Sequence, residues 1–215
     1  MKKLSAASIV LLLVVIGCKL PSSLSGGGGS GSSKGTSSGG SDPKADVVEA
    51  SKKFLALPFF TAKMEGTGQT EIKSQVEYAA PDKFHIKYLG GTGVGMEIIY
   101  IGKDSYMKSG DKWSKMPGSG TNIPNLRDSF TEEGLKTLSD VKFDGEDTID
   151  GKPAMAYSYK NVTPVGAYPF TSKIWLSQKT GVPLRIYVEY SNGALKNMMV
   201  NYDTESPVSI EAPIK

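Results

Sequence analysis

Cysteine and histidine are almost absent from the sequence, which has one of each, Cys18 and His85, among 215 residues. A zinc site needs several Cys, His or carboxylate ligands around one ion, and the folded part of the chain offers a single histidine. His85 falls on the predicted solvent-facing side of a strand with no nucleophile beside it, which is typical of a surface histidine. We therefore expect no enzyme activity, no metal and no cofactor.

Signals for binding nucleotides or nucleic acid are also missing. The glycine-rich run Gly90–Gly95 lacks the Lys-Ser/Thr pair of a phosphate-binding loop and precedes a strand rather than a helix. The chain has 25 Lys and Arg and 22 Asp and Glu, and four lysines and one aspartate of these precede position 43, which leaves 21 charges of each sign in the rest. A neutral domain presents no basic field, so we expect no nucleic-acid partner.

The sequence has no apolar run long enough to span a bilayer, but it begins with a short one. Met1-Lys2-Lys3 precedes an apolar stretch that is densest from Ile9 to Ile16, the pattern of a secretory signal peptide over residues 1–17. The stretch ends in Val15-Ile16-Gly17-Cys18, which resembles the lipobox of bacterial lipoproteins. The resemblance implies that a diacylglycerol is attached to the Cys18 sulfur and that the mature chain begins there. The alternative is a plain signal peptide with an incidental cysteine.

An acylated Cys18 makes the membrane the first expected partner and places the protein outside the cytoplasm. In a bacterium with two membranes we expect the outer membrane or the periplasm, because Lys19 replaces the Asp that resembles an inner-membrane retention signal. In a bacterium with one membrane we expect the cell surface. Residues 18–42 then form a disordered tether, because Lys19 to Ser41 is nearly all Ser, Gly and Thr. As a flexible coil its 23 residues span roughly 25–30 Å.

Residues 43–215 are long enough for one domain with its own core, and they contain no cysteine for a disulfide. A helix is expected first, because Ser41 or Asp42 can cap it and Pro43 suits its first position. Apolar side chains then recur at helical spacing until Pro58 forces the chain out of the helix; they are Val47, Val48, Phe54 and Leu55.

Most of the remaining sequence alternates between apolar and polar residues, as antiparallel strands with one buried face do. Clear stripes start at Ile72, Phe84 and Val182, and turn-forming pairs such as Asp150-Gly151 separate the strands. No helix of crossover length intervenes between consecutive strands. The predicted fold class is therefore mainly β (α+β), a monomer built on a curled antiparallel meander of about ten strands.

One helix-like segment interrupts the strands. Ser129 and Glu132 match a capping box. Four apolar residues follow helical spacing here, namely Leu126, Phe130, Leu135 and Leu138. Such a helix has to bury its apolar face, so we predict that residues 126–138 form a short lid over the apolar mouth of the curled sheet. The alternative is a permanently docked helix that completes the core.

The order of helix, strands, short helix and strands resembles the LolA/LolB lipoprotein-carrier fold and the related mycobacterial LppX/LprG lipoproteins. Three short motifs carry the resemblance, and the last of them resembles a terminal strand; they are Ala80-Pro81-Asp82-Lys83-Phe84-His85-Ile86, Ile101-Gly102-Lys103-Asp104-Ser105-Tyr106-Met107 and Val208-Ser209-Ile210-Glu211-Ala212-Pro213. The resemblance implies that residues 43–215 form a half-open β-barrel. Its concave face, covered by the N-terminal helix and the lid, is expected to hold acyl chains.

The function that this resemblance implies is a membrane-anchored lipoprotein that binds or transfers a lipid or the acyl chains of another lipoprotein. Candidate contacts are the inward-facing apolar residues of the strands, namely Met64, Ile72, Val76, Phe84, Ile86, Met155, Tyr157, Ile174, Leu176, Ile186, Val188, Met198 and Val200. The alternative is a structural or adhesive surface lipoprotein whose interior is a filled core without a ligand. A cavity between the sheet and the helices favours the first function, and a close-packed interior favours the second.

Overall fold

Helix α1 (Pro43–Leu55) opens the part of the chain that the structure, a computed structural model, describes: residues 42–69, 71–91, 93–116, 127–162 and 169–214. The Asp42 carboxylate accepts hydrogen bonds from the backbone N–H groups of Lys44 and Ala45 at 2.9 and 3.3 Å, and Pro43 is the first helical residue. The predicted start of the helix is therefore confirmed, with Asp42 as its cap. The helix ends three residues before Pro58, because a proline disfavours helical backbone in the residue that precedes it.

In the described residues, eleven strands form one sheet, in which every pair of neighbours is antiparallel. The strands are β1 (Phe59–Gly68), β2 (Ile72–Ala79), β3 (Lys83–Gly91), β4 (Glu97–Ile101), β5 (Asp104–Ser109), β6 (Lys112–Met116), β7 (Ser139–Ile149), β8 (Lys152–Val162), β9 (Pro169–Ser177), β10 (Pro183–Tyr190) and β11 (Leu195–Asp203). The predicted mainly β fold of about ten strands is confirmed.

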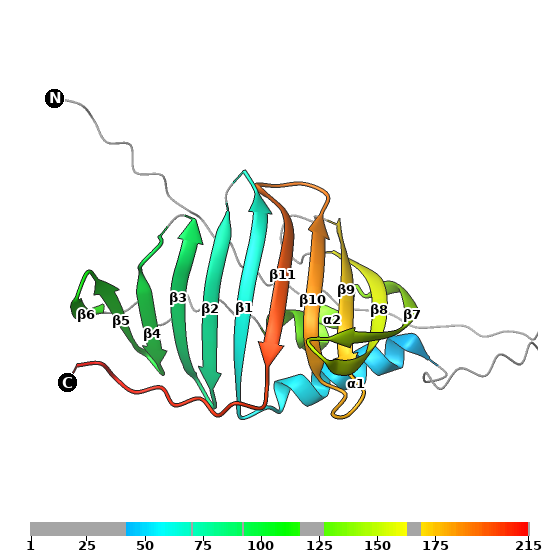
Figure 1. The fold of residues 1–215 in the computed structure, drawn as a ribbon, viewed down its shortest axis with the longest axis horizontal. Helices are drawn as coiled ribbons and strands as arrows, with labels where there is room; N and C mark the ends of the chain where they lie inside the picture. Colours follow the sequence, from blue (N-terminus) through cyan, green and yellow to red (C-terminus); the bar gives the residue numbers. More distant parts are fainter. Residues whose placement is uncertain (1–41, 70, 92, 117–126, 163–168, 215) are drawn as a thin grey trace, which may run out of the picture.

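The first and last strands lie side by side at the centre of the sheet, whose order is β6-β5-β4-β3-β2-β1-β11-β10-β9-β8-β7 (Figure 1). The chain therefore runs outward from β1 to the edge strand β6, crosses to the other edge strand β7, and returns strand by strand to β11. Because β6 and β7 do not pair, the curled sheet stays open, as the half-open barrel requires. The crossing carries the 3₁₀ helix η1 (Asp128–Phe130) and the short helix α2 (Glu132–Leu135).

One face of the sheet carries a continuous apolar core, and α1 packs on it. Aromatic rings cross this face in a row from η1 to β3, in which consecutive ring centroids are 4.4–5.1 Å apart. The row consists of Phe130, Phe54, Phe60, Tyr78 and Phe84, all of which are buried. Offset or tilted aromatic pairs stabilise a core beyond the area that they bury. The row therefore binds η1, α1 and the first three strands into one unit.

The opposite face has its own small apolar cluster, which the C-terminal segment covers. After β11 the chain crosses to the β4–β5 side of the sheet (Figure 1), where Ile210 packs with Ile99 and Tyr106. The predicted strand over Val208–Pro213 is wrong, since this segment has no strand pairing. The reason is that β4 and β5 already have strand neighbours on both sides, so the segment lies across them and contributes side chains instead of a ladder.

Turn residues set several of the hairpins. Asp150 and Gly151 both have positive φ angles, 50° and 79°, which is the backbone of the tight two-residue turn expected between β7 and β8. The sequence shows no clear apolar alternation for strands β1 and β6. In β1 the buried face is built partly from small residues, Ala62 and Gly66, which weaken the alternation of hydrophobicity, and β6 is a short and largely exposed edge strand.

Among the described residues, no helix is both long and apolar enough to cross a membrane. In the same part of the chain, no group of three or more acidic, histidine or cysteine side chains is placed to hold a metal ion.

Candidate functional site

The crossing segment between the two edge strands is less helical than its sequence predicts. A helix over 126–138 is expected, but the described part contains η1, the four-residue helix α2 and then β7 from Ser139. Thr131 caps α2, because its hydroxyl accepts a hydrogen bond from the Gly134 N–H at 3.2 Å. The prediction that Ser129 is the cap is therefore wrong. Gly134 weakens the helix, and the Thr137 hydroxyl that follows it bonds to Asn161 and Val162 of β8.

Side chains from both halves of the fold hold this segment in place. The Asn161 amide of β8 donates to the Gly134 carbonyl at 3.0 Å and accepts a hydrogen bond from the Thr137 hydroxyl. Lys44 of α1 donates to the Leu138 carbonyl at 3.0 Å. At the other end, the Arg127 guanidinium donates to the Tyr78 hydroxyl and to the C-terminal carbonyl of α1 at Leu55. The segment is thus tied to β8, to both ends of α1 and to β2.

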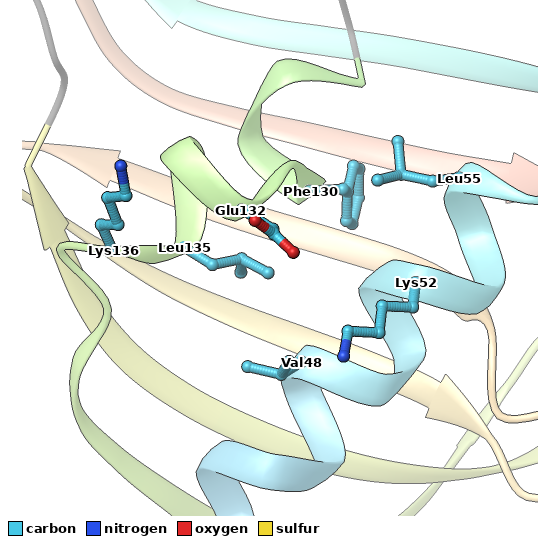
Figure 2. A pocket seen from close by; sticks show the side chains of 7 residues that line it. All are labelled: Val48, Lys52, Leu55, Phe130, Glu132, Leu135 and Lys136. Atoms are coloured by element: carbon cyan, nitrogen blue, oxygen red, sulfur yellow. The ribbon is translucent and has the colours of Figure 1, made fainter. Parts of the chain in front are cut away.

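A pocket of about 400 Å³ lies between α1 and this segment (Figure 2). Its apolar lining consists of Val48 and Leu55 from α1 and of Phe130 and Leu135 from the crossing segment. Its charged lining consists of Lys52, Glu132 and Lys136. Its volume and mixed lining match those of small-molecule sites, which occupy about 300–1,000 Å³, but its mouth is broad and open to solvent.

The predicted lid residues meet at this pocket. Phe130 and Leu135 line it, and both also contact the apolar core beneath, where Leu138 is buried as well. Phe130 is only 3% exposed, and its ring centroid is 4.4 Å from that of Phe54. These side chains therefore form the layer between the pocket and the core. Leu126 lies outside the described residues, as does Cys18.

The predicted cavity residues lie in the core rather than at the pocket. All of them except Ile72 belong to one continuous apolar cluster on the face that α1 covers, namely Met64, Val76, Phe84, Ile86, Met155, Tyr157, Ile174, Leu176, Ile186, Val188, Met198 and Val200. None of the predicted set lines the pocket. Ile72, near the end of the sheet where β2 begins, is partly buried. The sequence therefore identified the inner face, and the structure fills that face with packed side chains.

Three tyrosine hydroxyls belong to the polar groups of this interior. Tyr157 donates to the Asp46 carboxylate of α1 at 2.9 Å, and burial together with that carboxylate raises the pKa of Tyr157. Burial raises the pKa of Tyr159 to about 12 and also raises the pKa of Tyr202, which packs against Phe54. All three hydroxyls therefore stay neutral at physiological pH. They cannot serve as bases there, and they add no charge to the apolar interior.

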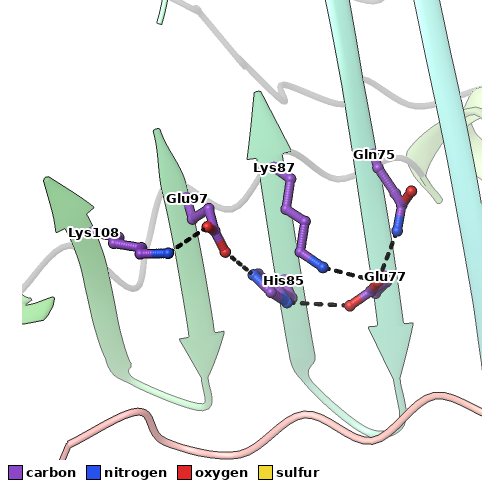
Figure 3. Close-up of polar contacts among 6 residues, drawn as sticks. All are labelled: Gln75, Glu77, His85, Lys87, Glu97 and Lys108. Carbon is purple, nitrogen blue, oxygen red and sulfur yellow. Dashed lines mark hydrogen bonds and ion pairs between the residues drawn. The ribbon is translucent and has the colours of Figure 1, made fainter. Parts of the chain in front are cut away.

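A charged network occupies the face opposite the core (Figure 3). His85 lies between two carboxylates, with Nδ1 3.1 Å from Glu77 and Nε2 3.1 Å from Glu97. Lys108 donates to Glu97 at 2.9 Å, and this hydrogen bond is the main reason that the pKa of Glu97 lies below its usual range. Lys87 pairs with Glu77 at 3.4 Å. The network contains no nucleophile, and its charged groups pair with one another. We therefore interpret it as a structural network.

No protein-family model matches the chain, and no curated protein matches it. Among solved structures, the lipoprotein LppX of Mycobacterium tuberculosis is similar with a TM-score of 0.61 and 17% identity, over 79% of this chain and 98% of LppX. LprF from Mycobacterium bovis is similar with a TM-score of 0.61 and 14% identity, over 80% of this chain and 97% of LprF. At this level of identity the likeness concerns the fold. The chain has the LolA/LppX-like fold that its sequence motifs predict.

Proposed function

We propose that the chain is a membrane-anchored extracytoplasmic lipoprotein that binds or transfers a lipid and is attached to the membrane through Cys18. The observation that carries the proposal is the pocket between α1 and the η1–α2 segment, whose apolar floor continues into the core. The fold shared with two lipoproteins supports a lipid-related role. The lipobox-like sequence before Cys18 supports the anchor.

An acyl chain enters this site over Phe130 and Leu135, which separate the pocket from the core. Each buried methylene contributes about 0.8 kcal/mol, so even a partly inserted chain gains several times the thermal energy. Movement of the η1–α2 segment away from α1 widens the pocket toward the core that Phe130 and Leu135 cover. This movement has to break the hydrogen bonds from Asn161, Lys44 and Arg127, whereas the four-residue helix itself adds little resistance.

The second candidate function is a structural or adhesive surface lipoprotein without a ligand. The packing of the inner face favours it, since side chains such as Tyr157, Ile174 and Leu176 are at most 2% exposed. The two functions differ in whether the pocket is a route to the interior or a surface depression over a finished core.

The presence or absence of a lipid that co-purifies with the full-length chain distinguishes the two functions. We expect native mass spectrometry to detect a bound lipid, and a fluorescent fatty acid to compete with it. Val48→Trp fills the pocket from α1, and Leu135→Trp fills it from the facing helix, so both variants should reduce the bound lipid at least severalfold.

The matched control is Val94→Trp, which makes the same change as Val48→Trp at a position that is 66% exposed and far from the pocket in sequence. This control should retain its lipid. The proposal is wrong if the wild-type chain neither carries a lipid nor binds the fatty acid, or if the three variants behave alike.

A further inference from the structure

Two opposite charges face the pocket without pairing. Lys52 lines it from α1, and Glu132 lines it from α2 (Figure 2). Among the described residues, neither side chain forms an ion pair or a side-chain hydrogen bond. Their sequence neighbours do pair: Lys53 lies 2.8 Å from Glu49, and Lys136 is bonded to Glu133. Three charged side chains line the pocket, and Lys136 is taken up by its bond to Glu133, so Lys52 and Glu132 are the two that remain available to a ligand.

The positions of these charges limit the headgroup that fits. A phosphate accepts hydrogen bonds from the Lys52 ammonium, and such charge-assisted bonds are about twice as strong as neutral ones. A headgroup that carries only negative charge brings that charge toward the Glu132 carboxylate as well, which repels it. A primary amine donates hydrogen bonds to this carboxylate, whereas a quaternary ammonium has no N–H to donate.

The apolar lining supplies the third requirement. Val48, Leu55, Phe130 and Leu135 offer a surface for acyl chains directly beside the two charges. A ligand that satisfies the whole pocket therefore combines a phosphate, a primary amine and an acyl chain in one molecule.

We propose that the pocket binds an aminophospholipid, with the phosphate on Lys52, the primary amine on Glu132 and the acyl chains over Phe130 and Leu135. This inference rests on the proposed lipid-binding function and adds the class of lipid. Lys52 and Glu132 together select the headgroup, while the apolar residues bind the acyl chain of any lipid.

The test measures binding of three lipids with identical acyl chains to the full-length chain by native mass spectrometry from detergent micelles. The lipids are phosphatidylethanolamine, phosphatidylglycerol and phosphatidylcholine. We expect phosphatidylethanolamine to bind the wild-type protein about fivefold more tightly than the other two, as suits partly exposed charged contacts. Lys52→Met should weaken binding of all three lipids, and Glu132→Gln should weaken only phosphatidylethanolamine.

Two residues away from the pocket lining provide matched controls: Lys53→Met removes a charge that faces Glu49 on its own helix, and Glu146→Gln removes an exposed carboxylate of β7. Both controls should keep the wild-type preference. Equal binding of the three lipids, or a Glu132→Gln variant that still prefers phosphatidylethanolamine, overturns the headgroup assignment and leaves lipid binding intact. Failure to bind any of the three lipids, with no fatty-acid binding either, overturns both proposals.

Discussion

Glu97 contacts two partners in the network opposite the core. One of its carboxylate oxygens accepts from Lys108 at 2.9 Å, and the other lies 3.1 Å from His85. The carboxylate belongs to a side chain that is only 24% exposed, so water screens these contacts less than it screens a surface pair. The lowered pKa of Glu97 means that the folded state favours its charged form, and this preference contributes to stability wherever the carboxylate is ionised.

Replacing Glu97 with Gln should lower the free energy of unfolding by about 0.5–1 kcal/mol at pH 7. The folded pKa lies below the ordinary value of 4.5, so the contribution is present above that value and is lost as the pH falls through the folded pKa. Urea unfolding at pH 7 and at pH 3 measures both effects. The control Glu71→Gln removes an exposed carboxylate with no side-chain partner among the described residues, and it should have little effect at either pH. An equal loss for Glu97→Gln at both pH values contradicts the electrostatic explanation.

Single residues show how far the sequence alone could predict this network. Alternation correctly separated His85 from its apolar neighbours Phe84 and Ile86. Its partners could not be predicted, because Glu77 faces His85 only through the register between β2 and β3. That register depends on where the turn between the strands begins and ends, and a shift of one residue reverses every side chain.

At the level of elements, the η1–α2 segment shows where local patterns failed. Helical spacing correctly grouped Phe130, Leu135 and Leu138 on the side that meets the core. The length of the helix was wrong, because Asn161 and Thr137 bind the segment to β8 and end the helical hydrogen bonding after one turn. Long-range hydrogen bonds of this kind override helix propensity, which differs by only about 1 kcal/mol between good and poor helix formers.

Asn161 is the residue that should decide how firmly this segment is held. Its side chain is buried, and Asn161→Ala leaves the Gly134 carbonyl without its partner and leaves the Thr137 hydroxyl with the Val162 carbonyl alone, which should lower stability by about 1–3 kcal/mol. Hydrogen exchange should become faster over residues 131–138 than over the central strands. Asn197→Ala is the control, because it removes an exposed hydrogen bond between β1 and β11 that does not involve the segment. Unchanged protection of residues 131–138 in Asn161→Ala rules out this role.

At the level of the whole molecule, the individual hairpins could be predicted from the sequence, but the strand pairing that joins the two halves of the sheet could not. Each hairpin has its own turn chemistry and alternation, which act locally. The pairing of β1 with β11 joins strands that are about 130 residues apart, and no local pattern encodes it. The pocket has the same property, since α1 and α2 supply its walls from distant parts of the chain. The sequence therefore predicted the inner face, and the chain topology decided which residues on it are accessible.

The same scale includes the proposed anchor at Cys18, which would determine where the pocket operates. We expect an acylated Cys18 to hold the domain near the bilayer, the source of its lipid. Cys18→Ala should then leave full-length precursor and abolish partitioning of the mature protein into a detergent phase. Lys19→Ala keeps the cysteine and should be processed normally.

Intact-mass spectrometry and detergent-phase partitioning measure the two effects separately. A wild-type mass that includes a diacylglycerol and lacks residues 1–17 is the expected result. The pocket lies within the folded domain, so the Cys18→Ala chain should still bind a fluorescent fatty acid in solution. This separates the anchor from the binding site. If Cys18→Ala shows the same mature mass and the same partitioning as the wild-type chain, Cys18 is not the anchor, and the domain must reach its membrane by another contact.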